Sequence, residues 1–172
     1  MPVTIERGGP SELFVKDYAC LEGMAPLDAK SASWPVIEAP LFNLVYHDAI
    51  LTTNRWQSPD NDYDLNGDFS TRQLRNMLAG NMPMFVIPLW EYPGISDMIE
   101  MINKTSAPWN RDIAFAEMTK HEFLSRDLNL QRSKFSNGAE VTVNFALCEN
   151  KLPDGKIIPG YGFLLTFSDG TI

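Results

Sequence analysis

Three carboxyl groups fall where strands of this chain are expected to end: Glu6, Asp48 and Glu91. Two indoles, Trp56 and Trp90, follow or adjoin the last two of these acids. Glycoside hydrolysis uses two carboxyl groups about 5 to 10 Å apart, one of them kept protonated by its surroundings. The residue types therefore supply candidate acids and sugar-stacking surfaces for such a site, and only the fold can bring two of the acids together.

The segment from Pro40 to Trp56 is predicted to present most of the ligand groups. Its first seven residues form an apolar run with high β propensity, so we expect a buried strand from Pro40 to Tyr46. The polar residues after this strand would lie in a loop at its carboxyl end, where α/β enzymes place ligand sites. The substrate-binding candidates of the whole chain are His47, Asp48, Arg55, Trp56, Trp90 and Glu91.

Plainer interpretations of these candidates stay open. His47 and Asp48 also suit an ordinary hydrogen-bonded strand terminus. Trp90 and Glu91 also suit an interfacial aromatic ring beside a solvated acid.

An acidic run offers a candidate Ca²⁺ site. Asp62, Asp64 and Asn66 match positions 1, 3 and 5 of a calcium loop, and Gly67 falls at the tight turn. Position 12, however, is Gln73 where a bidentate Glu belongs. A solvated polar loop is therefore the favoured interpretation, and a weak Ca²⁺ site is the alternative.

The composition is that of a soluble globular protein. The chain has 172 residues, of which 44% are hydrophobic and 21% charged. The net charge of −8 argues against nucleic acid or an anionic membrane as the main partner, because both attract clustered Lys and Arg. Cys20 and Cys148 have no second ligand at metal spacing, so we expect two buried thiols. No serine-nucleophile, P-loop or dinucleotide signature occurs.

The first part of the chain alternates strands and helices. A strand, a helix and a second strand within about 50 residues indicate a parallel βαβ unit. Glu6 lies at the end of a short strand, and Ser70-Thr71 and Ser96 are candidate helix N-caps. The expected strands are 3–5, 40–46 and 83–88, and the expected helices are 12–21, 72–79, 96–103 and 109–118.

From His121 onward the pattern alternates with a period of two. A three-residue loop, Ser136-Asn137-Gly138, is predicted to pair Lys134 with Glu140, with Gly138 in the left-handed region. Further strands are expected near 156–158 and 161–167. The predicted fold is thus α/β followed by antiparallel β: a partial (β/α)-barrel-like segment, 1–118, and an antiparallel segment, 119–172.

Several pieces of the sequence resemble the C-terminal part of large enzymes of the endo-α-N-acetylgalactosaminidase and α-N-acetylgalactosaminidase families. The resemblance spans roughly residues 40 to 165, and the pieces occur in the same order. They are Pro40-Leu41-Phe42-Asn43-Leu44-Val45-Tyr46-His47-Asp48, Leu78-Ala79-Gly80-Asn81-Met82-Pro83-Met84, His121-Glu122-Phe123-Leu124, Phe135-Ser136-Asn137-Gly138 and Val141-Thr142-Val143-Asn144-Phe145.

The resemblance implies a fold and a site. Such enzymes have a (β/α)8 barrel followed by β domains, and they cleave α-linked N-acetylgalactosamine with an Asp nucleophile and a Glu acid/base. The first part of this chain would be the last barrel strands, with Glu6 in the place of the acid/base. The nucleophile strand would precede Met1, so the chain is expected to be incomplete and inactive alone.

The sequence therefore indicates two candidate functions. One is a glycoside hydrolase-related protein that acts on or binds α-linked N-acetylhexosamine glycans, and the other is a non-catalytic carbohydrate-binding or protein-interaction module. An incomplete barrel would expose unpaired strand edges, so we expect self-association or a missing upstream domain. A complete chain would be cytoplasmic because no signal peptide is apparent, whereas a fragment of a larger enzyme would be secreted.

Overall fold

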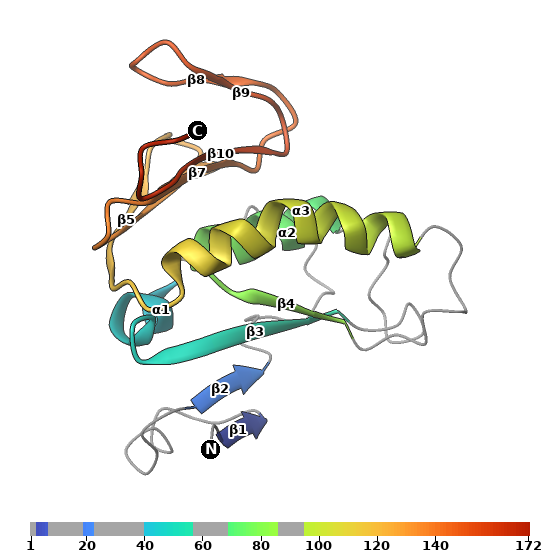
Figure 1. Ribbon diagram of the computed structural model, residues 1–172. Coiled ribbons are helices and arrows are strands. Elements are labelled where there is room, and N and C mark those ends of the chain that lie inside the picture. Colours follow the sequence, from blue (N-terminus) through green and yellow to red (C-terminus); the bar gives the residue numbers. More distant parts are fainter. Residues whose placement is uncertain (1–2, 7–18, 23–39, 57–68, 86–94) are drawn as a thin grey trace.

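A computed structural model describes residues 3–6, 19–22, 40–56, 69–85 and 95–172 (Figure 1). Within these residues, four strands form a parallel sheet whose spatial order follows the chain. Each strand pairs with the next one along the sequence, as in a (β/α) barrel. The sheet is not closed in the described part, so a barrel is not confirmed. The strands are β1 (Val3–Glu6), β2 (Ala19–Glu22), β3 (Ile50–Trp56) and β4 (Met82–Phe85).

A parallel βαβ unit is present in this part of the chain, but its first strand is β3 and not the predicted strand 40–46. Helix α2 (Phe69–Ala79) connects β3 to β4, and these two strands are parallel. The helix ends at Gly80 as expected, with φ at +74° in the region that glycine favours. It begins three residues earlier than predicted, so Ser70 and Thr71 lie in its first turn rather than at the N-cap.

Strand β3 pairs with its two neighbours along different parts of its length. The first four residues of β3, 50–53, pair with β2, whereas the last four, 53–56, pair with β4. The paired region therefore moves three positions toward the carboxyl end between one side of β3 and the other. Such a stagger is what closes sheets into barrels.

The antiparallel sheet predicted for the second part of the chain is confirmed, with the strand order β10-β7-β6-β5. Lys134 pairs with Glu140, and Gly138 has a φ of +91°, both as expected for the three-residue loop. A separate two-stranded hairpin joins β8 to β9. The strands are β5 (Met118–Phe123), β6 (Leu130–Phe135), β7 (Glu140–Asn144), β8 (Asn150–Lys151), β9 (Ile157–Ile158) and β10 (Gly162–Thr166).

Helices α2 and α3 (Ile95–Ile113) lie between the two sheets (Figure 1). The indole of Trp109 is fully buried there, and its Nε1 donates to the carbonyl oxygen of Met77 at 3.1 Å. Its ring meets Phe135 of β6 edge to face, with centroids 5.5 Å apart. The main core thus takes side chains from both sides of residue 118, and the domain boundary predicted at 118/119 stays a prediction. The buried members include Leu74, Met77, Leu78, Trp109, Ile113, Met118, Phe135, Val141 and Val143.

The prediction of a strand from Pro40 to Tyr46 is wrong. Residues Leu41–Tyr46 form the short helix α1, and the strand, β3, begins only at Ile50. Leu44 packs against the main core, while Leu41 and Val45 are exposed, so the run has a helical rather than an alternating pattern of burial. A short apolar run cannot be assigned to helix or strand by periodicity alone.

Two other predictions are corrected. Residues 19–22 form β2, which overturns the end of the helix expected over 12–21. The helices expected over 96–103 and 109–118 are one helix, α3, which continues through Pro108 and ends at Ile113, whereas Met118 begins β5. Proline in a helix interior removes one hydrogen bond, and the burial of Trp109 and Ile113 just beyond it offsets that loss.

Cys148 is an exposed free thiol, contrary to the expectation that both thiols are buried. Among the described helices, none combines the length and the apolar character that crossing a bilayer requires.

Candidate functional site

The carboxyl ends of the four parallel strands define the candidate site. Parallel strands end at one edge of their sheet, which is where barrel enzymes place their catalytic groups. Glu6 is the last residue of β1, as predicted, and Arg55 and Trp56 are the last two residues of β3. The structure therefore places these three predicted site residues toward the same edge, which we call the carboxyl edge. Glu6 and Glu22 are level with Thr53, so Arg55 and Trp56 lie two and three positions beyond them along β3.

Glu22 is a site candidate that sequence reasoning missed. It is the last residue of β2 and the register partner of Glu6 on the neighbouring strand. Adjacent strands lie about 4.8 Å apart, so the backbone brings two glutamates to neighbouring positions at the carboxyl edge. Assigning residues 12–21 to a helix concealed this pair. The residues before Glu22, Ala-Cys-Leu, have no marked β propensity, so the local sequence carried no clear signal for this strand.

His47 and Asp48 lie at the opposite edge of the sheet. They precede β3 instead of following a strand, because the apolar run before them is helix α1. The seven residues of β3 separate this amino edge from Trp56 by about 20 Å. One sugar ring cannot contact side chains at both edges of the sheet. The prediction that one loop site gathers His47, Asp48, Arg55 and Trp56 is therefore wrong. A sugar-binding role for any one of them stays a prediction.

The imidazole of His47 is buried and contacts residues far from it in the sequence. Its side chain is 4% exposed, and its Nδ1 lies 2.7 Å from the carbonyl oxygen of Ala116. The ring also packs against Phe135, with centroids 5.0 Å apart. This geometry matches the alternative of a hydrogen-bonded strand terminus. Asp48 beside it is exposed.

Burial lowers the pKa of His47 below its ordinary value of 6.5. Hydrogen bonds to the backbone of Ala116 and Gly80 and the charge of Asp48 act in the opposite direction, and they are outweighed. His47 is therefore neutral at pH 7, and its one N–H is available to only one carbonyl at a time.

Gly80 makes room for this imidazole. A Cβ added there would meet His47 Nε2 at 2.2 Å and the Cδ1 of Ile113 at 2.9 Å. Together with its positive φ, this close approach explains why glycine ends α2. The turn after α2 thereby becomes part of the packing at the amino edge.

Next to His47, three buried polar side chains join α1, β3 and the start of β4. Asn43 donates from Nδ2 to Thr52 Oγ1 at 3.0 Å and to Asn81 Oδ1 at 3.1 Å. Thr52 in turn donates to Asn81 Oδ1. All three are at most 6% exposed, so the network satisfies groups that would otherwise be costly to bury. This hydrogen-bond network is typical of a structural contact, here between helix α1 and the parallel sheet.

Several predicted residues fall outside the described part of the chain: Asp62, Asp64, Asn66, Trp90 and Glu91. Among the described residues, no group of three His, Cys, Asp or Glu side chains could hold a metal ion. The Ca²⁺ site therefore stays a prediction.

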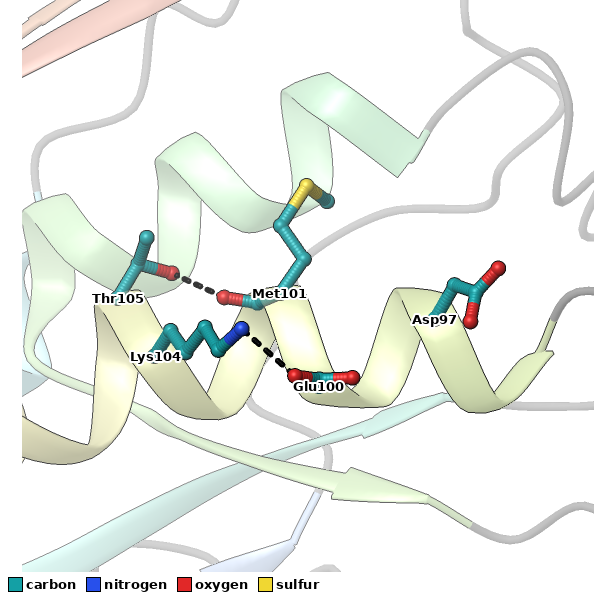
Figure 2. A pocket seen from close by; sticks show the side chains of 5 residues that line it. All are labelled: Asp97, Glu100, Met101, Lys104 and Thr105. Atoms are coloured by element: carbon teal, nitrogen blue, oxygen red, sulfur yellow. Dashed lines mark hydrogen bonds and ion pairs between the residues drawn. The ribbon is translucent and has the colours of Figure 1, made fainter.

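A depression on the outside of α3 is lined by residues of that helix alone (Figure 2). Lys104 and Glu100 form an ion pair of 2.6 Å across it, and both side chains are well exposed. Thr105 donates to the carbonyl oxygen of Met101 at 3.1 Å. Exposed i,i+4 pairs of this kind are typical of a solvated helix face.

The comparison with known families decides the relationship. Residues 25–134, more than half of the chain, match the family of glycosyl hydrolases related to GH101, namely GH129. The chain belongs to this family. No curated protein matches it.

Solved structures of an α-N-acetylgalactosaminidase, NagBb from Bifidobacterium bifidum, are similar to the chain. The quadruple mutant has a TM-score of 0.55 and 22% identity, over 84% of this chain and 24% of that one. The ligand-free form has a TM-score of 0.49 and 26% identity, over 74% of this chain and 22% of that one. The first likeness shows the shared fold. This GH129 chain spans about a quarter of the length of those chains.

Proposed function

We propose that this GH129 chain forms part of a glycosidase site for α-linked N-acetylhexosamine, with Glu6 as general acid/base. The observation that carries the proposal is the carboxyl edge of three neighbouring parallel strands, where Glu6 and Glu22 end β1 and β2, and Arg55 and Trp56 are the last two residues of β3. The family and the NagBb likeness favour α-linked N-acetylgalactosamine as the sugar.

Each residue at this edge has a proposed role. Glu6 exchanges a proton with the glycosidic oxygen, and Trp56 offers an apolar surface to the sugar ring. Arg55 donates hydrogen bonds to sugar hydroxyls. Glu22, the register partner of Glu6, is the proposed second carboxyl group of the site. Retaining glycosidases hold their two carboxyl groups about 5 to 5.5 Å apart.

We infer that the isolated monomer binds the sugar without turning it over. Four described strands leave the sheet open, so water reaches the sugar from the side where further strands of a barrel would stand. Barrel enzymes also draw their catalytic groups from several strands around the whole opening. A non-catalytic carbohydrate-binding module is the second candidate, since it needs the same edge but no carboxyl pair.

The test combines binding with turnover. Calorimetric titration with methyl α-N-acetylgalactosaminide should show millimolar affinity, weakened about tenfold or more by Trp56→Ala, the scale of a lost stacking contact of 1 to 2 kcal/mol. Methyl α-glucoside, which lacks the acetamido group, serves as the control sugar and should bind more weakly.

Hydrolysis of an aryl α-N-acetylgalactosaminide should stay at background for the isolated monomer. Turnover that is lost in Glu6→Gln and in Glu22→Gln would overturn the inference of inactivity and make the pair catalytic. No binding of either sugar at tens of millimolar would overturn the proposed function. Unchanged binding in Glu6→Gln together with background hydrolysis would favour the non-catalytic module.

A further inference from the structure

Strand β4 starts at a different level from the other three strands of the parallel sheet. Strands β1, β2 and β3 start level with one another, whereas β4 starts opposite Thr53, three positions beyond Ile50. This offset brings Met84 beside Arg55 near the carboxyl edge. Whatever sets the offset therefore also decides which residue of β4 adjoins a residue of the proposed site.

The apolar pattern of β4 does not select this offset. The strand reads Met-Pro-Met-Phe, and the sequence continues with Val-Ile-Pro, so polar and apolar residues do not alternate. Alternation usually fixes the register of a strand, because a slip moves apolar side chains to the wrong face. A slip of β4 along β3 would only exchange one apolar residue for another. The register must therefore be fixed by other groups.

The end of helix α2 determines where the pairing of β4 with β3 begins. The residue after this helix, Gly80, has a φ of +74°, and the N–H of Asn81 donates back to the carbonyl oxygen of Asn76 at 2.9 Å. This bond is the six-to-one bond of a Schellman motif. Because helix α2 takes the N–H of Asn81, the ladder with β3 begins one residue later, at Met82.

The side chain of Asn81 contacts β3 at this point. Continuing the register of Thr53 with Met82 back by one position places Asn81 opposite Thr52. The Oδ1 of Asn81 accepts hydrogen bonds from Thr52 and, at 3.1 Å, from Asn43 Nδ2. The side chains of all three hydrogen-bonded residues are at most 6% exposed. A slip of one position moves Asn81 by about 3.3 Å and leaves buried polar groups without these partners, which is costly.

We propose that Asn81 is a positioning residue that fixes the register of β4 against β3 through Thr52 and Asn43. The consequence for sugar binding rests on the proposed function: a fixed register keeps Met84 as the neighbour of Arg55. A slip of two positions preserves the faces of the strand but puts a different residue in that place. The buried network at the amino edge thereby acts on the carboxyl edge through the strand, without touching the sugar.

The first measurement reads the register without any sugar. In a background of Cys20→Ala and Cys148→Ser, the pair Thr53→Cys with Met82→Cys joins register partners, about 4.8 Å apart, and should form an intramolecular disulfide. The offset pair Thr53→Cys with Met84→Cys should stay reduced, because two more positions along the strand exceed the reach of a disulfide. Peptide masses after alkylation of the free thiols give the yields.

Asn81→Leu, which keeps the size of the side chain but removes the acceptor, should lower the yield of the cross-link between positions 53 and 82 several-fold. Val141→Ala is the matched control, because this fully buried residue of β7 lowers stability without altering the network. Its yield should equal that of the parent. Far-ultraviolet circular dichroism shows that each variant is folded. An unchanged yield in folded Asn81→Leu would overturn the proposal.

Thr52→Val is the milder variant, since it keeps the bond between Asn43 and Asn81 and should remain folded if Asn81→Leu does not. It should also lower the yield of the cross-link between positions 53 and 82, by less than Asn81→Leu does. Thr52→Ser restores the hydroxyl and should restore the yield. Equal yields in Thr52→Val and Thr52→Ser would overturn the role of the network in the register.

The second measurement separates positioning from stability. Calorimetric affinity for methyl α-N-acetylgalactosaminide should fall several-fold in folded Thr52→Val and return in Thr52→Ser. A lower midpoint of unfolding in Thr52→Val with unchanged affinity would show a purely structural role and overturn positioning of the site. If the parent protein itself binds no sugar, the proposed function fails, while the cross-links still decide whether Asn81 fixes the register.

Discussion

The two edges of the parallel sheet differ in what their residues do. At the amino edge, His47, Asn43 and Asn81 are buried and hydrogen-bonded into their surroundings. At the carboxyl edge, strands end in residues suited to chemistry, Glu6 and Glu22. Polar residues at the amino edge therefore serve packing, whereas those at the carboxyl edge are the ones for which we propose ligand binding, because barrel enzymes place their catalytic groups there.

The largest effect is expected from Gly80→Ala at the amino edge. The added Cβ would lie 2.2 Å from His47 Nε2 at a residue with φ of +74°, so strain and overpacking add. We expect a loss of about 2 to 5 kcal/mol in the free energy of unfolding, measured by urea denaturation.

Gly138→Ala is the matched control, because Gly138 has a positive φ but nothing lies within 4 Å of the added Cβ. Its loss should be only about 1 to 2 kcal/mol. Equal losses in the two variants would contradict the role of Gly80 in making room for His47.

The next effect tests the buried polar network. Thr52→Val keeps the shape of the side chain but removes the hydroxyl that joins Asn43 to Asn81. We expect the free energy of unfolding to fall by about 1 to 3 kcal/mol, since one buried N–H of Asn43 loses its acceptor and Asn81 keeps only the bond from Asn43. Thr119→Val, at an exposed hydroxyl that bonds the Lys134 carbonyl, should cost less than about 0.5 kcal/mol. A Thr52→Val loss as small as this would show that the network adds nothing at the amino edge.

A pH effect follows from His47, which is buried, and His121, which is half-buried. Burial lowers the pKa of both His47 and His121 below 6.5, so the unfolded chain binds protons first as the pH falls. Their contribution to stability is therefore complete above about pH 6.5 and is lost at lower pH, by at most about 1.4 kcal/mol per pH unit for each group.

Urea denaturation at pH 7.5 and pH 5.5 measures this loss. His47→Gln should remove its own share of the pH dependence, and His121→Gln should remove the remainder. Stability that rises on acidification over this interval would contradict the burial of a neutral His47.

The smallest effect on stability is expected at an exposed residue of the amino edge. Asp48→Ala should change the free energy of unfolding by less than about 0.5 kcal/mol, because the side chain is exposed. If the site lies at the carboxyl edge, this variant also leaves sugar affinity unchanged. A loss of affinity of about 1 to 3 kcal/mol, the scale of a charge-assisted hydrogen bond, would instead support the role predicted for Asp48 from the sequence.

The antiparallel part of the fold was the most predictable from the sequence. Period-two alternation and Asn137-Gly138 are strong local signals, and the register of Lys134 with Glu140 followed from them. The turn after α2 was equally readable, because Gly80 is a typical helix terminator.

The parallel part was harder because three of its four strands have only four residues. Residues 41–46 and 19–22 are both short apolar runs whose structure is set by tertiary packing rather than by periodicity. Mistaking α1 for a strand moved His47 and Asp48 to the wrong edge of the sheet, and mistaking β2 for a helix hid Glu22. Glu6 could be placed because Gly8-Gly9-Pro10 marks the end of its strand.

The central claim, that chemistry belongs to the carboxyl edge and packing to the amino edge, is tested most directly by amide chemical shifts. Titration of the isotope-labelled protein with methyl α-N-acetylgalactosaminide should shift the amides of Glu6, Glu22 and Trp56 in a saturable manner. The amides of His47 and Asn81 should stay unchanged. Saturable shifts confined to His47 and its neighbours would contradict the account.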